Sequence, residues 1–241
     1  MRTLAQLRQL LEQDPPAVHG VGTYGLSWEA AEAIAAFIQP GATTAETGAG
    51  MSTIVIAGLG ARHLAITPTE DEALKIRAWL QRNHLATDTL TFDHRLSWDA
   101  LPAYSQPKLD FALIDGCHGF PAPFIDFFYF SRNLKLAGIL AVDDVQLWTG
   151  KVLMDFLKSE PSWEFVSQAG KTAFFRKRRD LEWNEWEWDR QPFVARQSRP
   201  ALSGRVLNIL DLGRRAVRHL LTGDLAKLKR AFSMLLGRDV R

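Results

Sequence analysis

The sequence has a single cysteine, Cys117, among its 241 residues. An intramolecular disulfide is therefore impossible. A structural zinc site made of cysteines is disfavoured, because such sites use two or more thiolates. So little cysteine fits a reducing compartment. We expect Cys117 to be a small buried residue and not a nucleophile, because nothing near it in the sequence would lower the pKa of its thiol.

The sequence also has no uninterrupted apolar run of the about 18–20 residues that a membrane-spanning helix needs. Its first residues, MRTLAQLRQLLEQ, carry charges throughout and lack the apolar core of a secretory signal. We therefore expect a cytoplasmic protein, attached at most to the inner face of a membrane. Internal repeats and low-complexity tracts are absent too, and a hydrophobic share of 46% excludes wholesale disorder.

The net charge of +2 is small but unevenly distributed. Residues 192–241 contain 11 Lys and Arg against 3 Asp and Glu, a net charge of +8, which leaves −6 for the rest of the chain. Residues 204–238 have the periodicity of two amphipathic helices. We expect this basic tail to pack as a helical appendage, to form a homodimer, or to bind an anionic membrane surface. Nucleic-acid binding is disfavoured, because no nucleic-acid module accompanies the charge.

The middle of the chain alternates between strand-like and helix-like segments. The expected strands are 43–47, 63–67, 89–92, 110–115 and 139–143, and the expected helices are 3–12, 27–38, 51–59, 70–83, 123–134 and 150–158. Two further β-rich stretches, 163–166 and 172–175, predict a closing hairpin with an antiparallel strand at one edge of the sheet. The fold class is therefore α/β, a Rossmann-like three-layer sandwich with a mostly parallel seven-stranded sheet.

The first candidate site is the turn ETGAGMST, which follows the first strand. Gly48 and Gly50 let the backbone turn sharply and let a ligand approach without meeting a Cβ atom. The turn departs from the dinucleotide-binding pattern, because Thr53 stands at the third glycine and Thr67 at the acid that ends the second strand. Glu46 suits a cationic ligand without phosphates. A tight turn that binds nothing is the structural alternative.

The second candidate site is a group of carboxylates that follow two buried strands. Asp115 ends DFALID, and Asp143 and Asp144 end ILAVD. If these strands are neighbours, their ends lie about 5 Å apart. The carboxylates would then repel one another unless a cation, a shared proton or a positive ligand compensates them. An all-oxygen set favours a hard ion such as Mg²⁺. A purely structural role for the aspartates stays equally open. His118 is a candidate general base or a structural imidazole.

Three segments resemble class I S-adenosylmethionine-dependent methyltransferases. ETGAG is similar to motif I of that family, ALIDGCHGF to its fourth-strand segment, and AGILAVDDVQLW to its fifth-strand segment. The three occur in the order that the family has, and the resemblance covers about residues 20–178. The predicted hairpin also matches the family's sheet, whose last strand runs antiparallel.

The resemblance implies that the chain binds S-adenosylmethionine and transfers its methyl group. It places the methyltransferase domain at 41–180, between a helical segment at 1–40 and a Trp/acid segment with the basic tail at 181–241. The implied cofactor-binding residues are Glu46, Gly48, Ala49, Gly50, Ser52, Thr67, Glu70, Ser97 and Asp115. Asp115, His118 and Asp143 are the predicted catalytic residues, with His118 as the candidate base because of its place among the aspartates. Asp115, Asp143 and Asp144 are the metal ligands implied by the branch that includes catechol-type and macrolide-sugar O-methyltransferases.

Two positions depart from the family. The acid that binds the ribose hydroxyls ends the second strand, where this chain has Thr67, so Glu70 is the candidate substitute. The acid after the third strand is missing as well, since Leu96 and Ser97 stand there. The expected acceptor is a hydroxyl of a small molecule or glycan. The alternatives are an NAD(P)-dependent oxidoreductase on a related fold and a non-catalytic methyltransferase-like binding or assembly protein.

Overall fold

The computed structural model describes residues 2–18, 25–104, 108–180 and 191–198, together with Arg214 and Val217. The chain divides into two compact units, Met1–Trp186 and Glu187–Arg241. The Trp/acid stretch at 182–189 and, apart from the two single residues, the basic tail helices at 204–238 lie outside the described residues. In the second unit the described helix is α8 (Pro192–Gln197). Within the described ranges, no helix is both long and apolar enough to cross a membrane.

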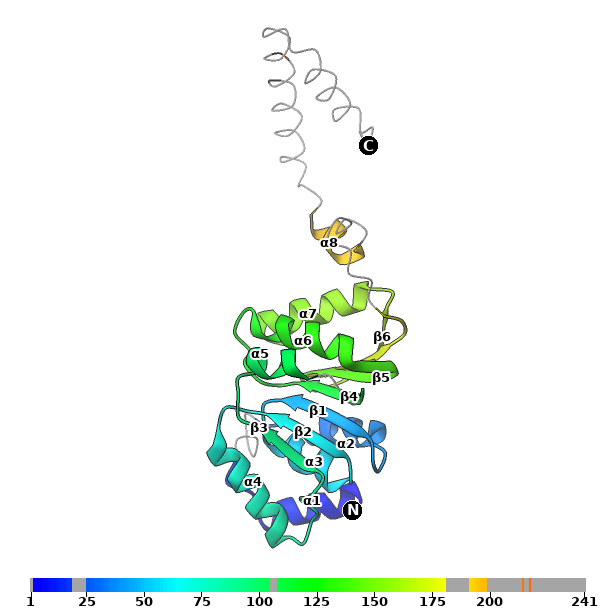
Figure 1. The fold of residues 1–241 in the computed structure, drawn as a ribbon. Coiled ribbons are helices and arrows are strands. Elements are labelled where there is room, and N and C mark those ends of the chain that lie inside the picture. Colours follow the sequence, from blue (N-terminus) through cyan, green and yellow to red (C-terminus); the bar gives the residue numbers. More distant parts are fainter. Residues whose placement is uncertain are drawn as a thin grey trace. The chain divides into compact units, whose positions relative to one another are not determined.

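The first unit is a seven-stranded sheet between two layers of helices (Figure 1). The strands are β1 (Thr43–Thr47), β2 (Arg62–Ile66), β3 (Leu90–Asp93), β4 (Leu109–Ile114), β5 (Leu134–Val142), β6 (Trp163–Ala169) and β7 (Thr172–Lys177). The helices are α1 (Leu4–Gln13), α2 (Trp28–Phe37), α3 (Met51–Gly58), α4 (Glu70–Arg82), α5 (Ser97–Ala100), α6 (Ala122–Asn133) and α7 (Trp148–Ser159), with a 3₁₀ turn at Leu101–Ala103. The Rossmann-like fold predicted from the sequence is confirmed.

Two apolar clusters, one on each face of the sheet, form the core. Helices α1 to α4 pack on one face and α5 to α7 on the other. Strand β4 shows why both faces are covered: Phe111 and Leu113 belong to the first cluster, and Ala112 and Ile114 to the second. A strand with apolar side chains on both faces is stable only when both faces are buried, which is typical of a parallel sheet between helices.

The strand order is β3-β2-β1-β4-β5-β7-β6. Strands β1 to β5 are parallel, and β7 pairs antiparallel with both β5 and β6. The order therefore reverses between β1 and β4. Ligands in open α/β sheets bind at such a reversal, beyond the carboxyl ends of the strands.

Three details differ from the sequence prediction. The antiparallel strand is not at the edge of the sheet, because β7 carries buried side chains on both faces while β6, in which only Trp163 is buried, takes the edge. Strand β5 begins at Leu134 instead of 139, directly where α6 ends. Helix α5 was not predicted, because four residues are too few to show helical periodicity.

Candidate functional site

The turn after β1 packs against the end of β4. Gly48 has a φ of +90°, and a Cβ atom at this position would overlap the backbone oxygen of Asp115. The Gly48 N–H donates to the carbonyl of Ile66 at 2.9 Å, and the Asp115 N–H donates to that of Thr47 at 3.2 Å. These bonds tie together the ends of β1, β2 and β4, and only glycine fits where they meet.

The buried side chain of Glu46 stabilises this turn through hydrogen bonds. Its buried carboxylate accepts hydrogen bonds from the hydroxyl of Thr53 and, at 3.0 Å, from Nε2 of His63. The Thr53 hydroxyl oxygen in turn accepts the N–H of Gly50 at 2.9 Å. Glu46 therefore fixes the glycine turn through Thr53. Its second oxygen, Oε2, has no hydrogen-bond partner among the described residues.

A cavity of about 300 Å³ lies where β1, β2 and β4 end. Five of the cofactor-binding residues predicted from the sequence line it: Gly48, Ala49, Thr67, Ser97 and Asp115. The other four predicted residues, Glu46, Gly50, Ser52 and Glu70, are not among the lining residues. The five predicted residues thus contribute the backbone of the glycine turn, hydroxyl groups and the carboxylate that follows β4.

Other residues of the cavity wall were missed by the sequence analysis. Ile66, Pro68, Leu96 and Trp98 give the cavity an apolar side, and Glu72 adds a carboxylate. Cys117 also lines it and is exposed, so the expectation that this cysteine is buried is wrong. The preceding residue, Gly116, packs closely on the turn after β1, since a Cβ atom there would approach Cβ of Thr47 to 3.1 Å.

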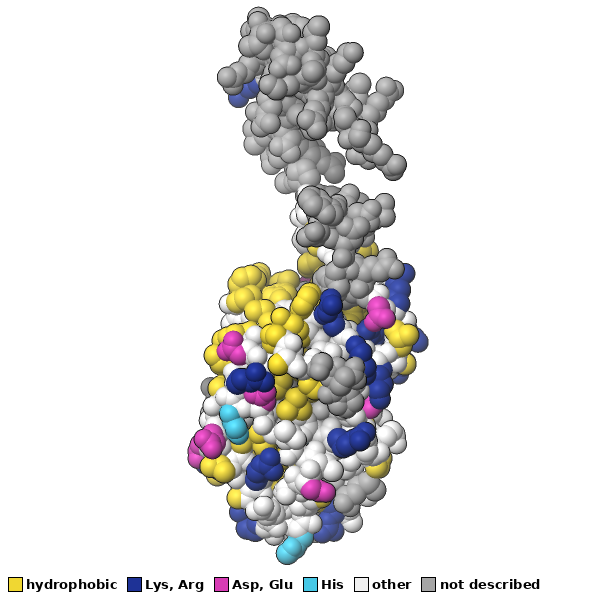
Figure 2. Space-filling view, viewed as in Figure 1, with side chains coloured by type: hydrophobic (Ala, Val, Ile, Leu, Met, Phe, Trp, Pro, Cys, Tyr) yellow, Lys and Arg dark blue, Asp and Glu magenta, His cyan; other side chains and the backbone are white. Residues whose placement is uncertain are grey.

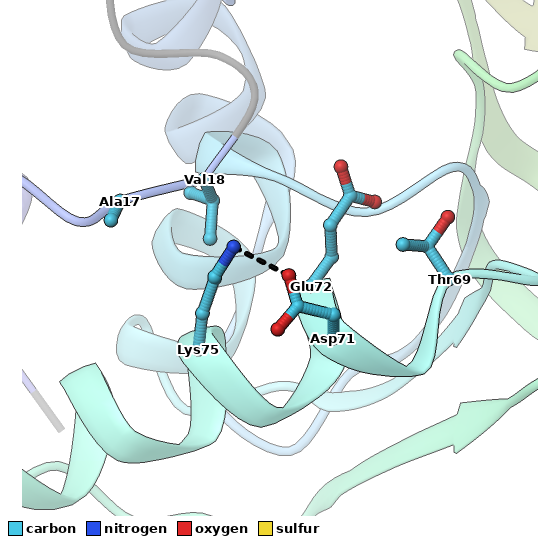
Figure 3. A pocket seen from close by; sticks show the side chains of 6 residues that line it. All are labelled: Ala17, Val18, Thr69, Asp71, Glu72 and Lys75. Atoms are coloured by element: carbon cyan, nitrogen blue, oxygen red, sulfur yellow. Dashed lines mark ion pairs between the residues drawn. The ribbon is translucent and has the colours of Figure 1, made fainter.

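Glu72, and not Glu70, is the acid of helix α4 that reaches the cavity. Residues two apart on a helix lie on nearly opposite sides of it, which explains why the first acid of α4 does not line the same space. Glu72 also borders a second cavity of about 300 Å³, beside the ion pair of Asp71 and Lys75 (Figure 3). It therefore stands between the two cavities.

Asp126 is a buried carboxylate of α6 beneath the first cavity. It is 0% exposed, and neither oxygen makes a hydrogen bond of ordinary geometry. Burial raises its pKa to about 6, although the hydroxyls of Ser97 and Thr47, which line the cavity, lower it in part. A half-satisfied acid in the core lowers stability, and such groups are frequent beneath functional sites.

The carboxylates that follow β4 and β5 do come together. The two strands are parallel neighbours with Ile114 opposite Val142, and the Asp143 N–H donates to the carbonyl of Ile114 at 3.0 Å. Burial, together with the carboxylates of Asp143 and Glu46, raises the pKa of Asp115 well above its usual range. Asp144 has a φ of 52°, a left-handed conformation that Asp tolerates better than most residues.

His118 lies among these acids. Its Nε2 is 3.0 Å from Oδ2 of Asp144 and 4.0 Å from Oδ1 of Asp115. The Thr149 hydroxyl donates to the His118 carbonyl at 2.6 Å and so joins the loop after β4 to the start of α7. One ligand atom from each of Asp115, His118 and Asp144 lies within 4.8 Å of the others. We call these three residues the His/Asp cluster.

The side chain of a lysine in the β6–β7 turn lies against the aspartates that follow β5. Lys171 Nζ is 3.1 Å from Oδ2 of Asp143 and 2.8 Å from Oδ1 of Asp144. Partial burial opposes its ionisation, but hydrogen bonds and charge from these aspartates raise its pKa. Burial likewise acts on Asp144, yet hydrogen bonds from Lys171 and Gln146 hold its pKa below the usual value. Lys171 is therefore a cation at neutral pH.

Of the predicted magnesium ligands Asp115, Asp143 and Asp144, Asp143 has partners within the chain at both of its carboxylate oxygens. Mg²⁺ requires ionised oxygens at about 2.0–2.1 Å in octahedral geometry. Here the Thr172 hydroxyl occupies one oxygen of Asp143, and Lys171 occupies the other. The metal assignment stays a prediction, and this geometry does not favour it.

Exposed aromatic side chains flank the His/Asp cluster. Phe120 follows His118 by two residues and is 72% exposed, and Trp148 opens α7 and is 65% exposed. Apolar side chains gather over α6 and α7 on the face shown in Figure 2. An exposed apolar surface beside a polar cluster is typical of a binding site.

No protein-family model matches the sequence, and no curated protein matches it either. Several solved structures are similar to this one. The O-methyltransferase TomG from Streptomyces achromogenes, in complex with SAM, is 14% identical with a TM-score of 0.54, over 74% of this chain and 91% of that one. Cofactor-bound Rv0187 from MTB is 18% identical with a TM-score of 0.52, over 73% and 90%. An rRNA methylase from Streptococcus thermophilus is 12% identical with a TM-score of 0.50, over 62% and 94%.

At these identities the similarity concerns the fold. The chain has the α/β fold of class I S-adenosylmethionine-dependent methyltransferases, as the sequence motifs predicted. The similar structures include an O-methyltransferase and an rRNA methylase, so the fold itself does not select an acceptor.

Proposed function

We propose that this protein transfers the methyl group of S-adenosylmethionine to a hydroxyl group of a small molecule or glycan. One observation carries the proposal: Asp115 lines the cavity at the carboxyl ends of the strands and also belongs to the His/Asp cluster. A donor in the cavity would therefore lie beside the histidine that can accept the acceptor's proton.

The wall of the cavity suits the parts of the cofactor. Ile66, Leu96 and Trp98 offer apolar surface for the adenine ring. The Glu72 carboxylate is placed to accept hydrogen bonds from the ribose hydroxyls. Asp115 offers a carboxylate for the sulfonium, and a cation bound beside it would stabilise the charged form against the burial and the neighbouring carboxylates that raise the pKa of Asp115.

The reaction needs little from the protein beyond alignment and proton removal. The acceptor oxygen attacks the methyl carbon, the O–C bond forms as the S–C bond breaks, and the electron pair of that bond goes to sulfur. S-adenosylhomocysteine is left as the product. We assign the acceptor's proton to the imidazole of His118, which Asp144 orients at 3.0 Å. The exposed aromatic rings of Phe120 and Trp148 favour an acceptor with a planar or apolar face.

Calorimetry with S-adenosylmethionine tests the cofactor. We expect one molecule bound per chain and no binding of NAD or NADP, because Thr53 and Thr67 replace the third glycine and the acid that dinucleotide sites use. The reverse selectivity would identify an oxidoreductase and remove the proposal.

Glu72→Gln is expected to weaken S-adenosylmethionine binding by at least about 10-fold, because a charge-assisted hydrogen bond to the ribose is lost. Glu70→Gln is the matched control, since it makes the same change two residues away, outside the cavity lining, and should leave the affinity unchanged. Calorimetry on both variants measures this. Equal affinities for the two would show that Glu72 does not hold the ribose.

His118→Asn is expected to reduce methyl transfer by about 100-fold or more while the S-adenosylmethionine affinity stays within about 2-fold, because the base is lost and the cofactor cavity is not changed. The assay follows labelled methyl groups onto a panel of catechols, other phenols and sugars. The control is His84→Asn at an exposed histidine after α4. Wild-type rates in the His118 variant would exclude this histidine as the base.

A further inference from the structure

The β6–β7 hairpin delivers a lysine to the His/Asp cluster by its register. Strand β7 pairs antiparallel with β5, with Ala173 opposite Val142, so the turn that precedes β7 must lie at the carboxyl end of β5. Gly170, with a φ of +56°, and Lys171 form this two-residue turn. The Val145 N–H donates to the Lys171 carbonyl at 3.0 Å, which fastens the turn to the loop after β5.

Lys171 and its neighbours occupy the carboxylate oxygens of the two aspartates that follow β5, Asp143 and Asp144. Lys171 Nζ holds one oxygen of Asp143 and one of Asp144. The Thr172 hydroxyl holds the other oxygen of Asp143, and His118 lies against the other oxygen of Asp144. Each carboxylate oxygen of the pair that ends β5 therefore has a partner within the chain.

We infer that Lys171 is the built-in cation of this site and that the protein transfers methyl groups without a divalent metal ion. The inference rests on the proposed function. Carboxylates that lie close together repel one another unless a positive charge compensates them. Here the ammonium group of Lys171 supplies this charge to Asp143 and Asp144. A divalent ion on these aspartates would have to displace Lys171 or remain beside it at the cost of repulsion.

Mn²⁺ binding, measured by electron paramagnetic resonance on the full chain, tests the inference without any acceptor. We expect wild-type protein to show no saturable Mn²⁺ binding up to about 1 mM, whereas Lys171→Met should bind at least about 10-fold more tightly, because the number of uncompensated ligand charges sets the affinity for such ions. The further change Asp144→Asn should abolish the new binding. Lys135→Met is the matched control, because Lys135 pairs with Asp110 at the opposite end of the strands.

Saturable micromolar Mn²⁺ binding by wild-type protein would overturn the inference, and so would a folded Lys171→Met variant that gains no affinity. The wild-type titration needs no variant, so it decides the question even if Lys171→Met fails to fold. S-adenosylmethionine affinity is measured in parallel after treatment with EDTA, and we expect it to be unchanged. Loss of cofactor binding both with and without metal would instead refute the proposed function and leave the Mn²⁺ result valid.

Discussion

Gly48→Ala is expected to abolish S-adenosylmethionine binding, with an affinity loss of at least about 100-fold. The φ of +90° alone disfavours a Cβ atom by about 1–2 kcal/mol. The larger effect is the overlap of that atom with the carbonyl of Asp115, which belongs to backbone and cannot rotate away. The turn after β1 and the end of β4 must then separate, and these two segments form part of the wall of the cavity.

Gly41→Ala is the matched control for this variant. Gly41 also has a positive φ, +78°, but a Cβ atom there would meet nothing within 4 Å, and the residue precedes β1 at the other end of the strand. We expect a loss of stability of about 1 kcal/mol and normal cofactor affinity. Calorimetry and chemical denaturation of both variants separate the two effects. Normal cofactor binding by Gly48→Ala would show that the ligand does not use this turn.

Asp126→Asn is expected to stabilise the protein by about 3 kcal/mol at pH 8. The pKa of Asp126 is about 6 in the folded chain against an ordinary value of 3.8. The folded chain therefore holds this proton more tightly than the unfolded chain, and wild-type stability falls as the pH rises from about 4 through about 6. Above pH 6, the difference of about 2 pKa units means that ionised Asp126 destabilises the folded wild-type protein by about 3 kcal/mol. The neutral amide of the Asp126→Asn variant avoids this loss of stability.

Urea denaturation at two pH values measures this effect. The advantage of Asp126→Asn should shrink to about 1 kcal/mol at pH 4.5, where most of the folded wild-type protein carries the proton. Asp110→Asn is the control with the opposite sign: burial acts on Asp110 too, but hydrogen bonds from Lys135 and Thr43 lower its pKa, so its loss should destabilise the protein at pH 8. An equal advantage of Asp126→Asn at both pH values would mean that Asp126 does not titrate in this range.

The sequence predicted the sheet well because its signals are local and repeated. Buried strands such as DFALID and ILAVD, and the glycine turn after β1, carry their own pattern in a few residues. The hairpin at the edge of the sheet was predicted too, but the order of its two strands was not. Whether β7 or β6 lies next to β5 depends on which strand can bury both of its faces, and the burial of β7 is a property of the assembled core.

The sequence predicted the members of the candidate site only where they directly follow a predicted strand. Asp115 and Asp143 follow neighbouring strands, so their convergence could be expected from the order of the segments. Lys171 and Asp126 could not be found this way. They reach the site from a hairpin turn and from a helix, through pairings that the local sequence does not record. The acid of α4 that lines the cavity is Glu72 and not the predicted Glu70, because the orientation of α4 about its own axis decides which of the two faces the cavity.

A crystal structure with S-adenosylhomocysteine bound tests the central claim most directly, which is that one cavity places a sulfonium donor beside the His/Asp cluster. We predict that the homocysteine part lies on the Gly48 turn, the ribose at Glu72, and the sulfur on the side of Asp115 and His118. Ligand density elsewhere on the chain, or a sulfur facing away from these two residues, would contradict the account.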